Sequence, residues 1–230
     1  MRRTALTVTL FALSALPAGA QTVLTIGATG RVEATPDEAV ASFTVQAMAP
    51  DAATAQAGVN AAMTKALAEA RAVSGVVATT GGYYASQQTQ DTQPPKTVYQ
   101  ASQSLRLVLP AADGLPPARF TDLLGRLQQQ GLLLNDLGGD LSAKVQQDAQ
   151  QAAVLAALDQ IKVQAAAVAA HLHEGVGPVK TLNVNAAPAP GPGPVPVLAM
   201  ARAAPAPVSA PGNIMVSADV TATLELDAAR

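Results

Sequence analysis

The C-terminal stretch 213–226 alternates between apolar and mostly polar side chains, and this pattern constrains the fold more than any other feature of the sequence. Alternation with a period of two places every second side chain on the same face of a β-strand. The apolar face consists of Ile214, Val216, Ala218, Val220, Ala222, Leu224 and Leu226. A strand with one apolar face needs a second layer to cover it, so we expect a sheet with helices packed on one side.

Further strand and helix patterns recur along the chain. The expected strands span residues 22–34, 39–47, 76–90, 97–109, 131–142 and 178–186. The expected helices are one of medium length at 51–74, a short one at 116–130 and a long one at 143–172. We therefore predict an α+β fold, in which an antiparallel-rich sheet packs against these three helices.

Each predicted helix carries an apolar stripe at spacings of three and four residues. Asp51 is suited to begin the first helix as its N-cap. The stripe of that helix contains Ala52, Ala55, Val59, Met63, Ala66, Ala70 and Val73, and that of the short helix contains Phe120, Leu123, Leu124 and Leu127. For the long helix we expect the buried stripe to contain Val154, Leu158, Ile161, Ala165, Val168 and Leu172.

The first twenty residues have the features of a secretory signal peptide. Arg2 and Arg3 precede an apolar stretch of about a dozen residues, which is too short for the roughly 20 residues of a membrane span. The stretch ends at Pro17, and the small-residue pattern at 18–20 predicts cleavage after Ala20. We therefore expect a periplasmic protein with no integral membrane span after cleavage. A retained membrane anchor is the alternative.

Charge and composition exclude several classes of partner. Without Arg2 and Arg3, 12 of the 14 basic residues remain against 16 acidic ones, a net charge of −4. Nucleic-acid binding needs clustered positive charge, so we predict no nucleic-acid partner. The chain has no cysteine, which removes thiol chemistry and cysteine-ligated metal sites.

Residues 187–212 are rich in proline and alanine and cannot form a regular helix or an inner strand. Because a well-patterned strand follows, we interpret this segment as a long loop inside one domain that spans residues 21–230. A proline motif that binds a partner is an alternative.

The segment Thr35-Pro36-Asp37-Glu38 lies between two expected strands and raises the question of a catalytic acid. Proline cannot donate a hydrogen bond to a sheet, and an aspartate side chain can close a turn by accepting hydrogen bonds from the backbone. The turn explains both residues, and we prefer it to a catalytic role for Asp37.

Other polar residues also have structural explanations. His171 and His173 are two positions apart, so they do not share a helix face, and we assign them to the end of the long helix. Glu174 could join them in a metal site, but the usual thiol ligands are missing. Asn135, Asp136 and Asp140 lack the spacing of a calcium loop, and we expect a β-bulge there. Tyr83 and Tyr84 are expected to be exposed.

No recognisable catalytic motif occurs in the sequence. It has no nucleophile elbow, no phosphate-binding glycine loop and no identifiable pair of glycosidase carboxylates. We therefore predict that the protein is not an enzyme and name no catalytic, cofactor-binding or metal-binding residue.

The order of these features resembles the SIMPL-domain family of exported bacterial proteins, which includes periplasmic immunogenic proteins. The segments that carry the resemblance are "TIGATGRVEATPDEAVASFTV", "AQAGVNAAMTKALAEARAVSGVVATT", "YQASQSLRLVL", "AAHLHEGVGPVKTLNV" and "APGNIMVSADVTATLEL". The most specific positions are Pro36-Asp37, Asn60, Tyr99, Gly177 and Pro211-Gly212. The chain departs from the family at Ala28-Thr29-Gly30, where many members have Gly-x-Gly, and this puts a close backbone approach at position 28 in question.

The resemblance implies an envelope protein that takes part in stress tolerance, and for some members it implies ring- or channel-like oligomers. We therefore expect a self-associating, non-enzymatic periplasmic protein with a role in envelope or oxidative stress. Two alternatives stay open. One is a module that binds a small molecule or peptide, with the Pro-rich loop as a lid. The other is a hydrolase whose carboxylates are dispersed in the sequence.

Overall fold

The computed structural model describes residues 22–91, 93, 95–185 and 210–228. In chain order the elements are β1 (Thr22–Ala34), β2 (Glu38–Ala49), α1 (Ala52–Ala72), β3 (Val77–Gln90), β4 (Lys96–Pro110), the single-turn helix η1 (Ala112–Gly114), α2 (Ala118–Gln129), β5 (Leu133–Asp140), α3 (Ala143–Leu172), β6 (Glu174–Asn185) and β7 (Ile214–Ala228). The predicted α+β class is confirmed. The predicted signal peptide and residues 187–209 of the predicted Pro/Ala-rich loop lie outside the described residues.

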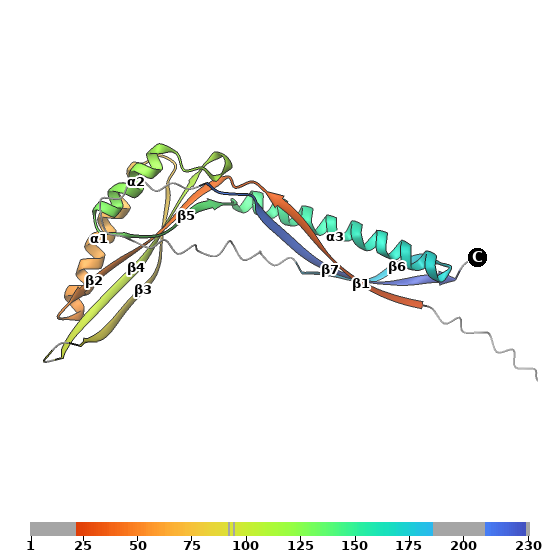
Figure 1. The fold of residues 1–230 in the computed structure, drawn as a ribbon, viewed down its shortest axis with the longest axis horizontal. Helices are drawn as coiled ribbons and strands as arrows, with labels where there is room; N and C mark the ends of the chain where they lie inside the picture. The colour runs from red at the N-terminus through yellow and green to blue at the C-terminus, as the bar shows by residue number, and fades with distance from the viewer. Residues whose placement is uncertain (1–21, 92, 94, 186–209, 229–230) are drawn as a thin grey trace, which may run out of the picture.

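The strands form two separate antiparallel sheets, where the sequence had suggested one. Strands β1, β7 and β6 form a three-stranded sheet in the order β1-β7-β6. Together with α3 this sheet makes a long, thin part of the molecule, which we call the arm. The other sheet has the order β3-β4-β2-β5, and with α1 and α2 it makes the head. Figure 1 shows the two parts end to end, with an angle between them.

The head contains the larger hydrophobic core. Helices α1 and α2 cover one face of the four-stranded sheet, and their predicted apolar stripes are buried there. The largest fully buried side chains of the head include Phe43 from β2 and Phe120 from α2. The predicted N-cap is also confirmed, because the Asp51 carboxylate accepts a hydrogen bond from the Thr54 N–H at 2.9 Å.

The arm has a thinner core because α3 packs on the sheet almost entirely through alanine. Its buried residues recur at every fourth position: Ala149, Ala153, Ala157, Ile161, Ala165 and Ala169. A step of four residues advances about 40° around a helix with 3.6 residues per turn. The buried stripe therefore winds slowly around α3, as contact with a twisted sheet requires.

This arrangement corrects the stripe predicted for the long helix. Of the predicted residues, Ile161 and Ala165 are buried, whereas Leu172 is 49% exposed. Val154 and Leu158 flank the buried stripe and are partly buried against the same core. Alanine occupies most of the stripe because the helix approaches the sheet closely. A Cβ atom added to Gly30 of β1 would lie 2.6 Å from the Ala157 nitrogen and still closer to the Ala153 carbonyl oxygen. The close backbone approach left in question at position 28 is therefore found at Gly30.

We predict that Gly30→Ala destabilises the arm by about 1–3 kcal/mol, since α3 must shift to admit the added methyl group. Gly27→Ala is the matched control, because a Cβ at this neighbouring position of β1 would lie 3.6 Å from the nearest atom, the Thr221 Oγ1. Thermal unfolding followed by circular dichroism measures both variants. Equal melting temperatures for the two variants would contradict the close packing of the α3 backbone against Gly30.

Candidate functional site

The segment that joins the arm to the head is fixed by several hydrogen bonds around Asp37. Asp37 lies between β1 and β2, and its backbone N–H donates to the Asp140 carbonyl oxygen at 3.1 Å. The Ala111 N–H donates to the Asp37 carbonyl oxygen at 2.9 Å, and the Ser142 N–H donates to the Asp37 carboxylate at 2.7 Å. Asp37 thereby connects the ends of β4 and β5 to the start of α3.

Two prolines and two glycines pack beside Asp37 in the same junction. Pro36 is buried, and a Cβ added to either Gly114 or Gly139 would come within 3 Å of its side chain. Pro211, which precedes β7, also borders both glycines, at 2.7 Å from a Cβ added to Gly139 and 3.3 Å from one added to Gly114. The junction thus brings together segments that are far apart in the sequence, and it gives Pro36, Asp37 and Pro211 a structural role.

The pKa of Asp37 reflects this role. Partial burial acts to raise its pKa, but the hydrogen bonds from the side chain and backbone of Ser142 outweigh burial, and the net pKa is lowered from 3.8. The pKa of Glu38 is raised, first by burial and then by the negative charges of Asp37 and Asp140, against which Arg106 acts.

Four charged residues therefore gather here, a grouping that the sequence analysis missed. Arg106 forms an ion pair with Asp140 at 2.7 Å on an exposed surface. Asp37 binds Ser142, and Asp140 also accepts a hydrogen bond from the Leu141 N–H. These carboxylates hold the chain in place at the surface and do not converge in a deep, water-excluding cavity. The register of β2 between β4 and β5 brings them together, and no local motif signals it.

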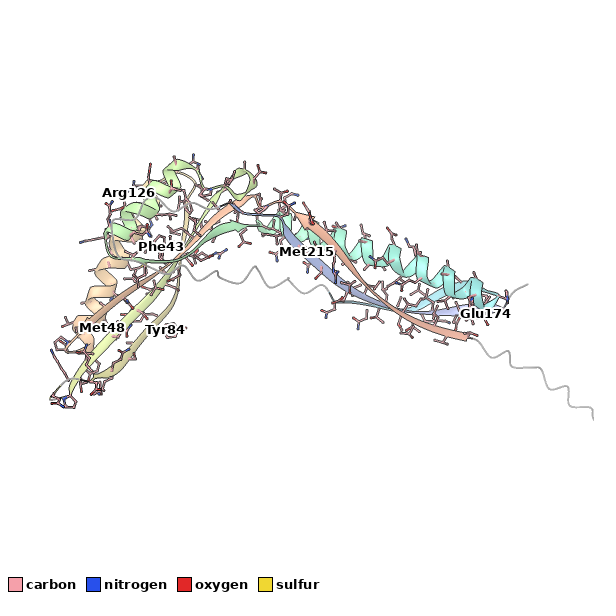
Figure 2. All side chains as sticks on the ribbon, in the orientation of Figure 1. Phe43, Met48, Tyr84, Arg126, Glu174 and Met215 are labelled. Atoms are coloured by element: carbon pink, nitrogen blue, oxygen red, sulfur yellow. The ribbon has the colours of Figure 1, made fainter. Side chains whose placement is uncertain are left out.

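His171, His173 and Glu174 lie at the far end of the arm, where α3 meets β6 (Figure 2 labels Glu174). His173 is the C-cap of α3, with a left-handed φ of 60°, and its N–H donates to the Ala169 and Ala170 carbonyl oxygens. The assignment of this pair to the helix end is confirmed, although His173 acts through its backbone. The Glu174 carboxylate accepts a hydrogen bond from the Thr22 hydroxyl at 2.9 Å, which ties the start of β6 to the start of β1.

The sequence Asn135-Asp-Leu-Gly-Gly-Asp140 forms most of strand β5, and its polar side chains have different partners. Asn135 donates to the Thr44 hydroxyl at 2.8 Å, and Asp140 pairs with Arg106. The predicted bulge occurs, but at Asn135 and not at the glycines, because Ser42 pairs with Asp136 while Phe43 pairs with Leu134. Within the described residues no group of three His, Cys, Asp or Glu side chains could hold a metal ion.

The exposed surface of the head includes all of β3 except Ala78, which is partly buried. Tyr83 and Tyr84 are exposed as predicted, and Tyr84 is 71% exposed (Figure 2). The Tyr84 ring covers Gly82, where an added Cβ would lie 2.7 Å from the ring. On the helix side, a shallow hollow of about 220 Å³ opens between α1 and β3, lined by Ala52, Ala55, Ala85, Ser86, Gln87, Tyr99 and Gln100.

The exposed surface of the arm is unusually apolar. Four side chains of β6 are 44–54% exposed: Val176, Val179, Leu182 and Val184. They pair in register with β7 residues that α3 buries, such as Val220 and Leu224, so they lie on the helix side of the sheet without being covered. By length and composition α3 could also cross a membrane; in the fold its alanine stripe packs on the sheet.

Comparison with known proteins adds one finding. The family model SIMPL, described as a protein of unknown function (DUF541), matches residues 24–224, a range that includes nearly all of the described residues. This match confirms the family resemblance seen in the sequence. No curated protein matches the chain.

We predict that Asp37→Ala lowers the free energy of unfolding at neutral pH by about 1–2 kcal/mol, because the Ser142 N–H loses a charged acceptor. Asp37→Asn keeps an acceptor oxygen and should lose less. Since the pKa of Asp37 is lowered by folding, its stabilisation is present above the ordinary value of 3.8 and is lost as the pH falls through the folded pKa.

The difference in melting temperature between the wild type and Asp37→Asn should therefore be largest near neutral pH and shrink in acid. Asp122→Asn, which removes an exposed carboxylate on α2, is the control and should leave the melting temperature nearly unchanged at each pH. A difference that stays constant down to acid pH would contradict the role assigned to the Asp37 charge.

Proposed function

Because the chain belongs to the SIMPL family, whose members are generally exported, we propose that it is a periplasmic, non-enzymatic protein that associates with itself and supports tolerance of envelope or oxidative stress. The proposal has three parts, which are location, mode of action and physiological role. Observations on the sequence and the structure support the first two, and the family resemblance supports the third.

The composition of the core carries the non-enzymatic mode of action. Among the described residues, every buried side chain is apolar, and no charged or polar residue is buried. Enzymes usually hold catalytic groups in partly buried sites that perturb their pKa values. Here the resolved pKa shifts fall on Asp37, Glu38, Asp51 and Lys144, which lie at the junction or at the starts of helices. These positions favour structural roles over chemistry.

The shape of the molecule supports self-association. The arm is a single helix on three strands, and its apolar β6 side chains are about half exposed. Contiguous exposed apolar surface usually marks a contact site. The head also ends in an open strand edge, and an open edge can pair with another strand. Assembly of several copies would cover surfaces of this kind.

The predicted signal peptide supports the periplasmic location. We expect the protein from a periplasmic extract to begin at Gln21, which mass spectrometry of the purified chain can measure. Size-exclusion chromatography with light scattering should then give a mass that is a multiple of the mature chain at micromolar concentration. A strictly monomeric protein at high micromolar concentration would contradict self-association.

The stress role predicts a phenotype. Cells that lack this protein should survive oxidant treatment less well than the parent strain, and the full-length chain should restore survival. A version without residues 1–20 is the control and should fail to restore it, because that version stays in the cytoplasm. Unchanged survival of the deletion strain, measured as colony counts after exposure, would remove this part of the proposal.

A further inference from the structure

Strand β3 is the one open sheet edge among the described strands that carries no charge and no proline. Proteins usually protect an open edge with charged residues, proline or irregular pairing. The other three edges have such protection: β1 carries Arg31 and Glu33, β5 carries Asp136 and Asp140, and β6 carries Pro178 and Lys180. An edge without charge or proline can pair with another strand wherever its own pairing is regular.

The outer part of β3 is also long and regular enough to accept a strand. Residues 83–90 pair with 96–103 of β4 without interruption, after an irregularity between Thr80 and Tyr83. All eight residues are exposed, so neither face of the strand is covered by the rest of the head. A typical strand has about 5–6 residues. The free edge therefore offers a full strand's length of backbone donors and acceptors.

A ladder of glutamine side chains leads to this edge across the face opposite the helices. Gln100 of β4 donates to the Gln46 side chain of β2 at 3.2 Å, and Gln88 of β3 donates to Gln100. The ladder thus crosses three neighbouring strands and reaches the last strand of the sheet. A strand added beyond β3 with uncharged polar side chains on this face would continue the same pattern.

We propose that β3 of one copy pairs antiparallel with β3 of a second copy about a two-fold axis, which joins the two head sheets into one continuous sheet. This inference rests on the proposed self-association and specifies where it occurs. Directly opposed residues lie on the same face of a sheet. The polar side chains of Ser86 and Gln88 in one copy therefore lie beside the same polar side chains of the second copy. Because the strand is uncharged, two copies meet without like charges, although each mature chain carries a net charge of −4.

The helix side of the edge also has room for a second copy. The hollow between α1 and β3 opens beside Ala85 and Gln87. Side chains on the helix side of an added strand can therefore lie next to β3 without a clash. An isologous contact of this kind closes on itself and leaves the arms free for further contacts.

Charge substitutions on β3 test the pairing. In the mature chain, Ser86→Lys/Gln88→Lys should weaken association, since like charges then oppose each other across the two-fold axis. Ser86→Glu/Gln88→Glu should do the same, and an equimolar mixture of the Lys and Glu variants should associate again. Light scattering measures the mass of each sample, and circular dichroism verifies that each variant is folded.

The matched control is Thr181→Lys/Asn183→Lys, which places the same charges two residues apart on β6, one of the two open edges of the arm. It should leave the β3 contact intact. An assembly that survives the β3 variants but dissociates with the β6 variant would overturn the inference while leaving self-association in place. A monomeric wild type would overturn both.

Cross-linking gives an independent result. The natural chain has no cysteine, so single cysteines can be introduced without background. An equimolar mixture of Ser86→Cys and Gln88→Cys should form disulfide-linked dimers under mild oxidation, whereas Asn183→Cys should form fewer. Equal cross-linking on β3 and β6 would contradict a specific β3 contact.

Discussion

The hydrogen bonds of Asp37 are the constraint on which the rest of the structure depends. Without them the chain would have no fixed point at which β1 leaves the arm and β2 enters the head. One residue binds the end of β4, the end of β5 and the start of α3, and beside it Pro36 and Pro211 pack against Gly114 and Gly139. These contacts lie where the head and the arm meet at an angle (Figure 1).

The two parts satisfy the same need for burial in different ways. The head encloses phenylalanine and leucine side chains between a sheet and two helices. The arm relies on close contact between backbones, with alanine on α3 facing Gly30 on β1. Close approach compensates for small side chains through dispersion contacts, but it buries little area per residue. This explains why apolar residues of β6 and of the outer face of α3 stay exposed.

Local patterns predicted the elements and most of the buried faces well. Asp51 was identified as an N-cap, the stripes of α1 and α2 were assigned correctly, and the Pro36-Asp37 segment was interpreted as structural. The stripe of α3 was correct only in part: Ile161 and Ala165 are buried, but the prediction favoured large residues such as the exposed Leu172 and missed most of the buried alanines. The cluster of Asp37, Glu38, Arg106 and Asp140 was missed, since only strand register brings these residues together.

The sequence by itself determined the α+β class, the order of the strands and helices, and the family, because these depend on local periodicity and on segments that can be compared one by one. Only the tertiary structure decided that the strands divide into two sheets and that β3 ends one of them as an uncharged edge. Alternation shows which face of a strand is apolar, but it carries no information about which strand lies beside it. That choice depends on contacts between residues far apart in the chain, such as Asp37 with Ser142.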